Sequence, residues 1–148
     1  MSTMSEQEIK DLTRRMWDEY NAVKGDLARL NAWVDRFYSP TVLFHAPISG
    51  DMNFEQFKQF EAAALAISTR FTVKHVIAEG DIVVSQFTMN MNHQGPFMGL
   101  PATGKSFQVE GSMIAKMAGG RCEEIWFYWD TLGLMRGLGA IPTPPAPK

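Results

Sequence analysis

The stretch FQVEGSMIAKMAGGRCEEIWFYW, residues 107–129, decides the fold of this chain. Apolar and polar residues alternate on both sides of the Gly119–Gly120 pair. A period of two is typical of a strand with one buried face, and a glycine pair between two such runs favours a tight hairpin. The apolar positions are Phe107, Val109, Met113, Ala115 and Met117 before the turn, and Ile125, Phe127 and Trp129 after it. The stretch therefore predicts two paired antiparallel strands that bury the same side of a sheet.

Two more alternating runs lie upstream of this hairpin. Their predicted apolar faces consist of Phe71, Val73, His75 and Ile77 in the first strand, and Phe87, Met89, Met91 and His93 in the second. Gly80–Asp81 favours a turn between them. Residues 94–105 contain three Gly and two Pro, and they are predicted to form a loop.

The first half of the chain has helical periodicity instead. Ser5 followed by Glu8 forms the pattern of a capping box, and apolar residues then recur every three or four positions as far as Tyr20. A second helix is predicted over residues 27–37, because Ser39–Pro40 disfavours its continuation. We expect both helices to be amphipathic and to cover one face of the sheet.

Two shorter elements follow these helices. Residues 42–44 are apolar and predict a brief strand. Asn53 is the predicted cap of a third helix, whose apolar face includes Phe60 or Glu61 and extends to Ile67. Helices come first and strands later, which is typical of the α+β fold class.

Length and composition restrict the class of protein. The 148 residues suit one domain, predicted over 5–140 and followed by a flexible Pro-rich tail over 141–148. A net charge of −2 argues against a nucleic-acid partner. One Cys excludes an internal disulfide, and with only three scattered His it argues against a metal site. The chain starts without a secretory signal and has no apolar run of about 18 residues, so we expect a cytoplasmic protein with no membrane partner.

One loop resembles the signature of a known family. The sequence HQGPFMGLPATGK at 93–105 is similar to that of the SnoaL-like polyketide cyclases, and 119–121, 124–126 and 134–139 follow in the family's order. The resemblance extends from about residue 9 to residue 140. It implies the cone-shaped α+β barrel shared with nuclear transport factor, ketosteroid isomerase, scytalone dehydratase and limonene epoxide hydrolase. It also implies a deep apolar pocket closed by helices, and a homodimer.

The resemblance also implies a chemistry, and the sequence departs from it. Characterised cyclases of the family close a ring by an aldol step without a metal or cofactor. They use an acidic residue on the last strand and a histidine on the strand before it. The corresponding positions here are Phe127 and Met113, which are both apolar. We therefore expect no cofactor, and we expect the family's acid and base to be replaced or lost.

Four other side chains are candidates for acid–base catalysis near neutral pH: His45, His93, Tyr20 and Asp130. Each has a structural alternative. The histidines and Tyr20 can be hydrogen-bonded core residues, and Asp130 precedes a predicted short helix that it can cap. The residues predicted to contact a ligand are Trp17, Trp33, His75, Met89, Met91, Met113, Phe127 and Trp129. The ten Met and ten Phe of the chain suit an apolar pocket of adaptable shape.

Three functional hypotheses follow from these patterns. The first is a cofactor-free lyase, isomerase or cyclase that acts on a hydrophobic, polyketide-like carbonyl compound; dehydration by two His and a Tyr is a variant of it. The second is a non-catalytic binder of an apolar small molecule, because Phe127 and Met113 replace the expected acid and base. The third is a dimeric interaction module that uses the outer face of the sheet, where Trp126 and Tyr128 are predicted to lie.

Overall fold

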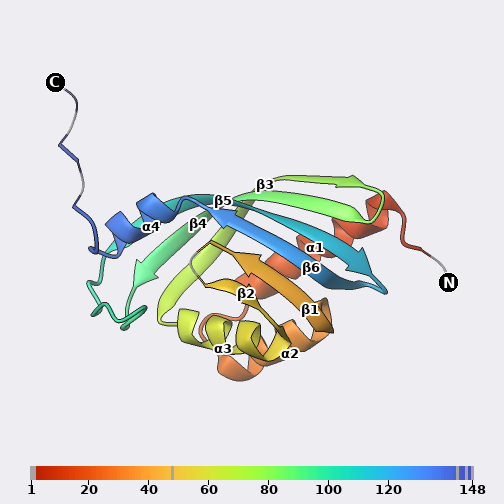
Figure 1. The fold of residues 1–148 in the computed structure, drawn as a ribbon, viewed down its shortest axis with the longest axis horizontal. Helices are drawn as coiled ribbons and strands as arrows, with labels where there is room; N and C mark the ends of the chain where they lie inside the picture. The colour runs from red at the N-terminus through yellow and green to blue at the C-terminus, as the bar shows by residue number, and fades with distance from the viewer. Residues whose placement is uncertain (1–2, 48, 143, 146, 148) are drawn as a thin grey trace.

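The computed structural model describes residues 3–47, 49–142, 144–145 and 147, and it shows one curved sheet that arches over three helices (Figure 1). A fourth, short helix lies at one end of the sheet. The elements in chain order are α1 (Glu6–Asn21), α2 (Leu27–Phe37), β1 (Tyr38–Ala46), β2 (Gly50–Met52), α3 (Phe54–Ala64), β3 (Ile67–Glu79), β4 (Ile82–His93), β5 (Ser106–Ala118), β6 (Arg121–Trp129) and α4 (Thr131–Gly137). The predicted α+β fold class is confirmed.

The sheet has the strand order β2-β1-β6-β5-β4-β3. All neighbours are antiparallel except β1 and β6, which are parallel. The two end strands, β2 and β3, do not pair with each other. The sheet is therefore curved and open, and it does not close into the expected barrel. Helix α1 packs on β3, α3 packs on β1, and α4 packs on β5. The concave face of the sheet and these helices therefore enclose the apolar interior.

Local capping explains where the helices begin. The Ser5 hydroxyl accepts a hydrogen bond from the Glu8 backbone N–H at 3.1 Å, and the Glu8 carboxylate accepts one from the Ser5 N–H at 2.7 Å. Asn53 makes the equivalent exchange at the start of α3. Asp130 caps α4 by accepting from the Gly133 N–H at 2.9 Å. All three predicted helix starts are confirmed, because each cap supplies a partner for a backbone donor that lacks one.

Two predicted boundaries are wrong. The third helix does not extend to Ile67: it ends at Ala64, and Ile67 opens β3 opposite His93, where the side chain is buried. The brief strand predicted at 42–44 is the middle of β1, which begins immediately after α2. Pairing with β6 extends this strand in both directions, since tertiary hydrogen bonds outweigh weak local preference.

The predicted face of β3 is also wrong in its second half. The register between β3 and β4 shifts between Val73 and His75. A bulge of this kind reverses the alternation of side chains beyond it. Val76 is therefore buried, whereas His75 and Ile77 point to solvent, with Ile77 63% exposed. The alternation predicted for β4, β5 and β6 is confirmed.

Two further findings concern the whole chain. The predicted tail contains residues 143, 146 and 148, which lie outside the described residues, and its other members belong to no helix or strand. Within the described ranges, no helix is both long enough and apolar enough to cross a membrane.

Candidate functional site

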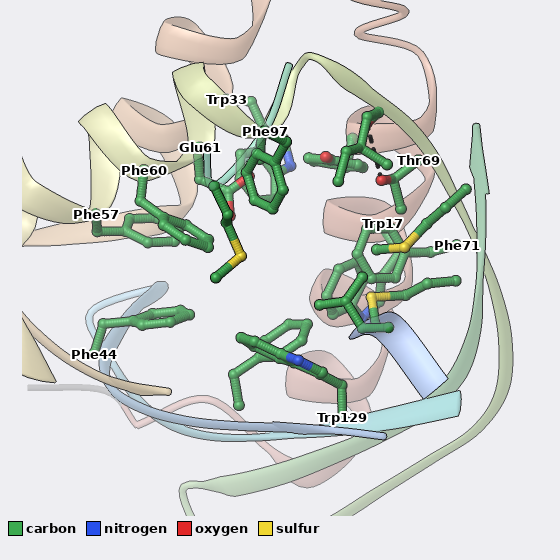
Figure 2. Close-up of a pocket in the computed structure, with 18 of the residues that line it drawn as sticks. Trp17, Trp33, Phe44, Phe57, Phe60, Glu61, Thr69, Phe71, Phe97 and Trp129 are labelled. Carbon is green, nitrogen blue, oxygen red and sulfur yellow. Dashed lines mark hydrogen bonds between the residues drawn. The ribbon is translucent and has the colours of Figure 1, made fainter. Parts of the chain in front are cut away.

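An apolar cavity lies between the helices and the concave face of the sheet (Figure 2). It holds about 770 Å³ of space between atoms, including the solvent at its mouth. Aromatic rings form most of its wall, and they come from α1, α2, α3, β1, β3, β6 and the loop over 94–105. Seven of the residues predicted to form a site line it: Trp17, Tyr20, Trp33, Met89, Met91, Phe127 and Trp129. A concave, mostly apolar cavity with few polar groups is typical of a site for a small molecule.

His45 lies outside this cavity, on the outer face of the sheet. Its Nδ1 is 2.7 Å from the Asp51 carboxylate, and its Nε2 is 2.9 Å from the Glu124 carboxylate. Both hydrogen bonds raise the pKa of His45 above its ordinary value, and the bond to Glu124 contributes most. The ring also stacks on Trp126 with 5.5 Å between centroids. His45 therefore joins β1, β2 and β6 at the edge of the sheet.

His93 is fully buried, but it does not line the cavity. Its Nδ1 is 3.1 Å from the Thr103 hydroxyl, and its backbone bonds to Lys105 and Gly104. These contacts hold both ends of the loop over 94–105 together. The loop in turn carries Phe97 and Met98 into the cavity wall. The contacts of His93 fit the structural alternative given for the histidines, a hydrogen-bonded core residue.

The other three predicted residues are also outside the cavity. His75 is exposed beyond the β3 bulge, with its Nδ1 2.7 Å from the Gln86 amide oxygen. Asp130 is exposed at the start of α4, where it acts as the cap. Met113 is 1% exposed and packs within the sheet core, opposite Phe127 in the β5–β6 register. Only Phe127 of that pair reaches the cavity.

The acid in the cavity is Glu61, on α3. Among the described residues that line the cavity, Glu61 is the only charged one. Its side chain is partly buried among the rings, and burial raises its pKa from 4.5 to about 7. Figure 2 shows its carboxylate directed inward between Phe60 and Phe97. A signal was present in the sequence, since Glu61 occupies an apolar position of the predicted third helix.

Two phenols lie within electrostatic reach of Glu61. Burial, and less strongly the charge of Glu61, raises the pKa of Tyr20 above its ordinary value. Burial likewise raises the pKa of Tyr38, with smaller contributions from Cys122, Glu61 and Tyr20. Both phenols therefore stay protonated at neutral pH and can donate hydrogen bonds. Edge contacts with Trp33 at 5.0 and 5.1 Å hold the two rings in place.

No hydrogen bond joins the Glu61 carboxylate or either phenol to another of the described residues. No pattern in the sequence predicted Tyr38 or Glu61 as a site residue. Tyr38 follows the end of α2 directly, where no periodicity indicates its direction. Among the described residues, no group of three or more His, Cys, Asp and Glu is placed to ligate a metal ion.

The model of the SnoaL-like polyketide cyclase family matches residues 11–138 of this chain. The chain belongs to the SnoaL-like polyketide cyclase family. Among proteins with curated descriptions, no sequence gives a significant match.

Solved structures of similar fold support the same architecture. TsrD from Streptomyces laurentii is 25% identical, with a TM-score of 0.75 over 94% of this chain and 100% of its own. AclR from Streptomyces galilaeus, provisionally named a hydroxylase, is 24% identical, with a TM-score of 0.79; the match covers 95% of this chain and 91% of AclR. A protein from Jannaschia, provisionally named a SnoaL-like polyketide cyclase, is 23% identical, with a TM-score of 0.77; the match covers 96% of this chain and 100% of the Jannaschia protein.

Membership of the SnoaL-like family establishes the fold of this chain but not its reaction. Proteins named for different chemistries share the fold, so function depends on the side chains in the cavity. In this SnoaL-like chain those side chains are Glu61, Tyr20 and Tyr38, together with the aromatic wall.

Proposed function

We propose that this SnoaL-like protein catalyses proton transfer at a carbon next to a carbonyl group, on a hydrophobic, polyketide-like compound and without a cofactor. Glu61 is the proposed general base. The observation that carries the proposal is a single carboxyl group with a pKa of about 7 inside an aromatic cavity. A base whose pKa is close to the working pH combines a useful ionised fraction with the greatest basicity.

The proposed reaction starts when the Glu61 carboxylate removes a proton from the carbon beside the carbonyl. The electron pair of that C–H bond moves onto the carbonyl oxygen and forms an enolate. The hydroxyl of Tyr20 or Tyr38 donates a hydrogen bond to this oxygen. Such a donor stabilises the developing negative charge more strongly in an apolar cavity than in water.

The enolate then has two routes. Where the substrate has a double bond next to the α-carbon, the enolate is a dienolate. Glu61, now a carboxylic acid, can then return the proton at the γ-carbon while the double bond moves into conjugation with the carbonyl, which completes an isomerisation. Alternatively, the enolate carbon can attack a second carbonyl carbon of the same molecule. That step forms a carbon–carbon bond, and the resulting alkoxide takes the proton back from Glu61, which completes an aldol ring closure. In both routes the proton that Glu61 removes is returned, so the enzyme is regenerated.

Exchange of hydrogen for deuterium at the α-carbon tests the first step directly. The ketone 2-tetralone is incubated with the protein in D₂O, and deuterium uptake is measured by NMR. We expect exchange faster than in buffer alone, rising with pH through an apparent pKa of about 7. Glu61→Gln should lose at least about 100-fold, as expected for removal of a general base. Glu123→Gln, an exposed carboxylate on β6, is the matched control and should behave like the unmodified protein.

Equal exchange by the protein and its Glu61→Gln variant would refute Glu61 as the base. If 2-tetralone binds but gains no deuterium above the buffer rate, the alternative function is favoured, namely non-catalytic binding of an apolar small molecule. That alternative is motivated by the apolar wall, in which Phe127 stands at the position where the family resemblance implies an acid.

The homodimer is a separate proposal. The outer face of the sheet presents Trp126 and Tyr128, and Tyr128 is 52% exposed. Aromatic residues of this kind are enriched in interfaces. Sedimentation analysis of the protein and its Tyr128→Glu variant tests the idea, since a monomer at all concentrations would reject it.

A further inference from the structure

The cavity wall contains three tryptophans, and they differ in what their indole N–H groups bind. Trp17 donates to the Ser85 hydroxyl at 3.0 Å, and Trp33 donates to the Met16 carbonyl at 2.8 Å. The Nε1 of Trp129 is buried and bonds to none of the described residues. The same wall thus contains two satisfied indoles and one buried donor without a partner.

A buried donor without a partner is costly, and native structures rarely retain one without a reason. On the same face of β6 the ring of Trp129 packs edge-on against Phe127, with 5.1 Å between the ring centroids. Phe or Leu would fill the same place without this cost. Retention of an indole here is explained if a bound molecule supplies the acceptor.

The position of Trp129 indicates where that acceptor lies. Figure 2 shows Glu61 on the α3 side of the cavity and Trp129 across it, on the sheet side. We infer that Trp129 is a specificity-determining residue, whose indole N–H binds a second oxygen of the substrate at the end remote from Glu61. The inferred role of Trp129 rests on the proposed function and narrows the class of substrate that the protein would accept. The substrate is a flat, apolar compound with two separated oxygen acceptors, one beside Glu61 and one at β6.

The cavity can adapt to deliver such an oxygen. The Trp129 Nε1 is shielded from water, so a ligand has to displace neighbouring side chains to reach it. The wall includes Met89, Met91 and Met98, whose unbranched side chains rearrange at low cost. Because the donor is not hydrated, the new hydrogen bond replaces no bond to water, which favours binding of a carbonyl over a hydrocarbon of the same shape.

A matched pair of rigid ligands tests the inference. Fluorene and 9-fluorenone have the same tricyclic frame, and only the second has a carbonyl oxygen; neither depends on turnover. We expect the protein to bind fluorenone about threefold to tenfold more tightly than fluorene, the value of one hydrogen bond. Trp129→Phe should abolish this preference, so that fluorene and fluorenone bind with the same affinity whatever the loss of ring contact does to both. Tyr20→Phe removes a competing hydrogen-bond donor from the wall of the same cavity, and the preference should survive it.

NMR of the unmodified protein supplies a readout that does not depend on a variant's folding. The four indole N–H signals are recorded, and the Trp129 signal is assigned through contacts of its ring with the ring protons of Phe127. Fluorenone should move the Trp129 proton downfield, whereas fluorene should not. Trp17 and Trp33 are internal controls, because their N–H groups are already bonded and both ligands should affect them alike.

Two results would overturn the inference alone. One is equal affinity for both ligands in the unmodified protein, and the other is a fluorenone preference that survives Trp129→Phe but disappears in Tyr20→Phe. In either case the deuterium exchange by Glu61 can still stand. If neither ligand binds, the apolar carbonyl site itself is wrong, and the proposed function fails together with this inference.

Discussion

Replacing Glu61 by Gln should change how the stability of the protein depends on pH. Burial raises the pKa of Glu61 from 4.5 in its ordinary state to about 7 in the folded chain. Below pH 4.5 the group is neutral in both states, and its ionisation has no effect on stability. Between pH 4.5 and 7 the unfolded chain ionises first, so the free energy of unfolding falls as the pH rises.

The size of this effect follows from the two pKa values. Their difference is about 2.5, and each unit corresponds to about 1.4 kcal/mol, so the full loss above pH 7 is about 3 kcal/mol. Glutamine has nearly the same shape and does not ionise. Glu61→Gln should therefore gain up to about 3 kcal/mol relative to the unmodified protein between pH 4 and pH 8.

Urea unfolding at half-unit steps from pH 4 to pH 8.5 measures this difference. Glu123→Gln again serves as the control, because Glu123 is exposed on β6 and its replacement should give a nearly constant difference. The reasoning is refuted if the Glu61→Gln curve runs parallel to that of the unmodified protein. That result would mean that the Glu61 carboxyl is as well solvated in the folded chain as in the unfolded one.

Three further perturbations test the packing around the site. The hydrogen bonds that His45 makes to Glu124 and Asp51 raise its pKa, so its stabilisation is complete below pH 6.5 and declines as the pH rises through the folded value. His45→Gln should therefore lower the free energy of unfolding more at pH 5.5 than at pH 9, by at most about 1 kcal/mol. Phe87 is fully buried, and Phe87→Ala should cost about 3–5 kcal/mol in urea unfolding. A Cβ on Gly111 would lie 2.8 Å from the Tyr128 carbonyl oxygen, so Gly111→Ala should cost about 1–3 kcal/mol.

Each of these three predictions has an outcome that would contradict it. A pH-independent effect of His45→Gln would mean that the imidazole contributes by packing on Trp126 rather than by charge. A loss below 1 kcal/mol for Phe87→Ala would mean that the surrounding rings close the space. A neutral Gly111→Ala would mean that β5 and β6 can separate at this point without cost.

Much of the fold follows from local patterns in the sequence. The capping residues Ser5, Asn53 and Asp130 act on backbone groups within three positions, so their effect is visible without tertiary structure. The hairpin over 107–129 follows from alternation and its glycine turn for the same reason. The errors at Ile67 and in β3 have the opposite cause. Pairing with β4 decides where β3 begins and where its register shifts, and that partner is distant in the sequence.

The residues of the candidate site divide in the same way, into those that local patterns predict and those that only tertiary contacts decide. Seven of the predicted residues line the cavity because side chains on one face of a strand or helix share a direction that periodicity reveals. Histidine and aspartate drew attention by their chemistry, yet His45, His93 and Asp130 bond to neighbours outside the cavity. Glu61 occupies an apolar position of the predicted third helix, but periodicity alone does not predict a catalytic role for it, because a carboxylate on an amphipathic helix usually points to water.

The sequence by itself determined the α+β class and the aromatic character of the interior, since these depend on composition and short-range periodicity. The motif at 93–105 carried the resemblance to the SnoaL-like family. Only the tertiary structure decided which polar groups reach that interior. Curvature of the sheet against α3 brings Glu61 among the rings and raises its pKa, and packing around β6 leaves the Trp129 N–H without a partner. Burial and hydrogen-bond pairing depend on residues far apart in the chain, so no local pattern contains them.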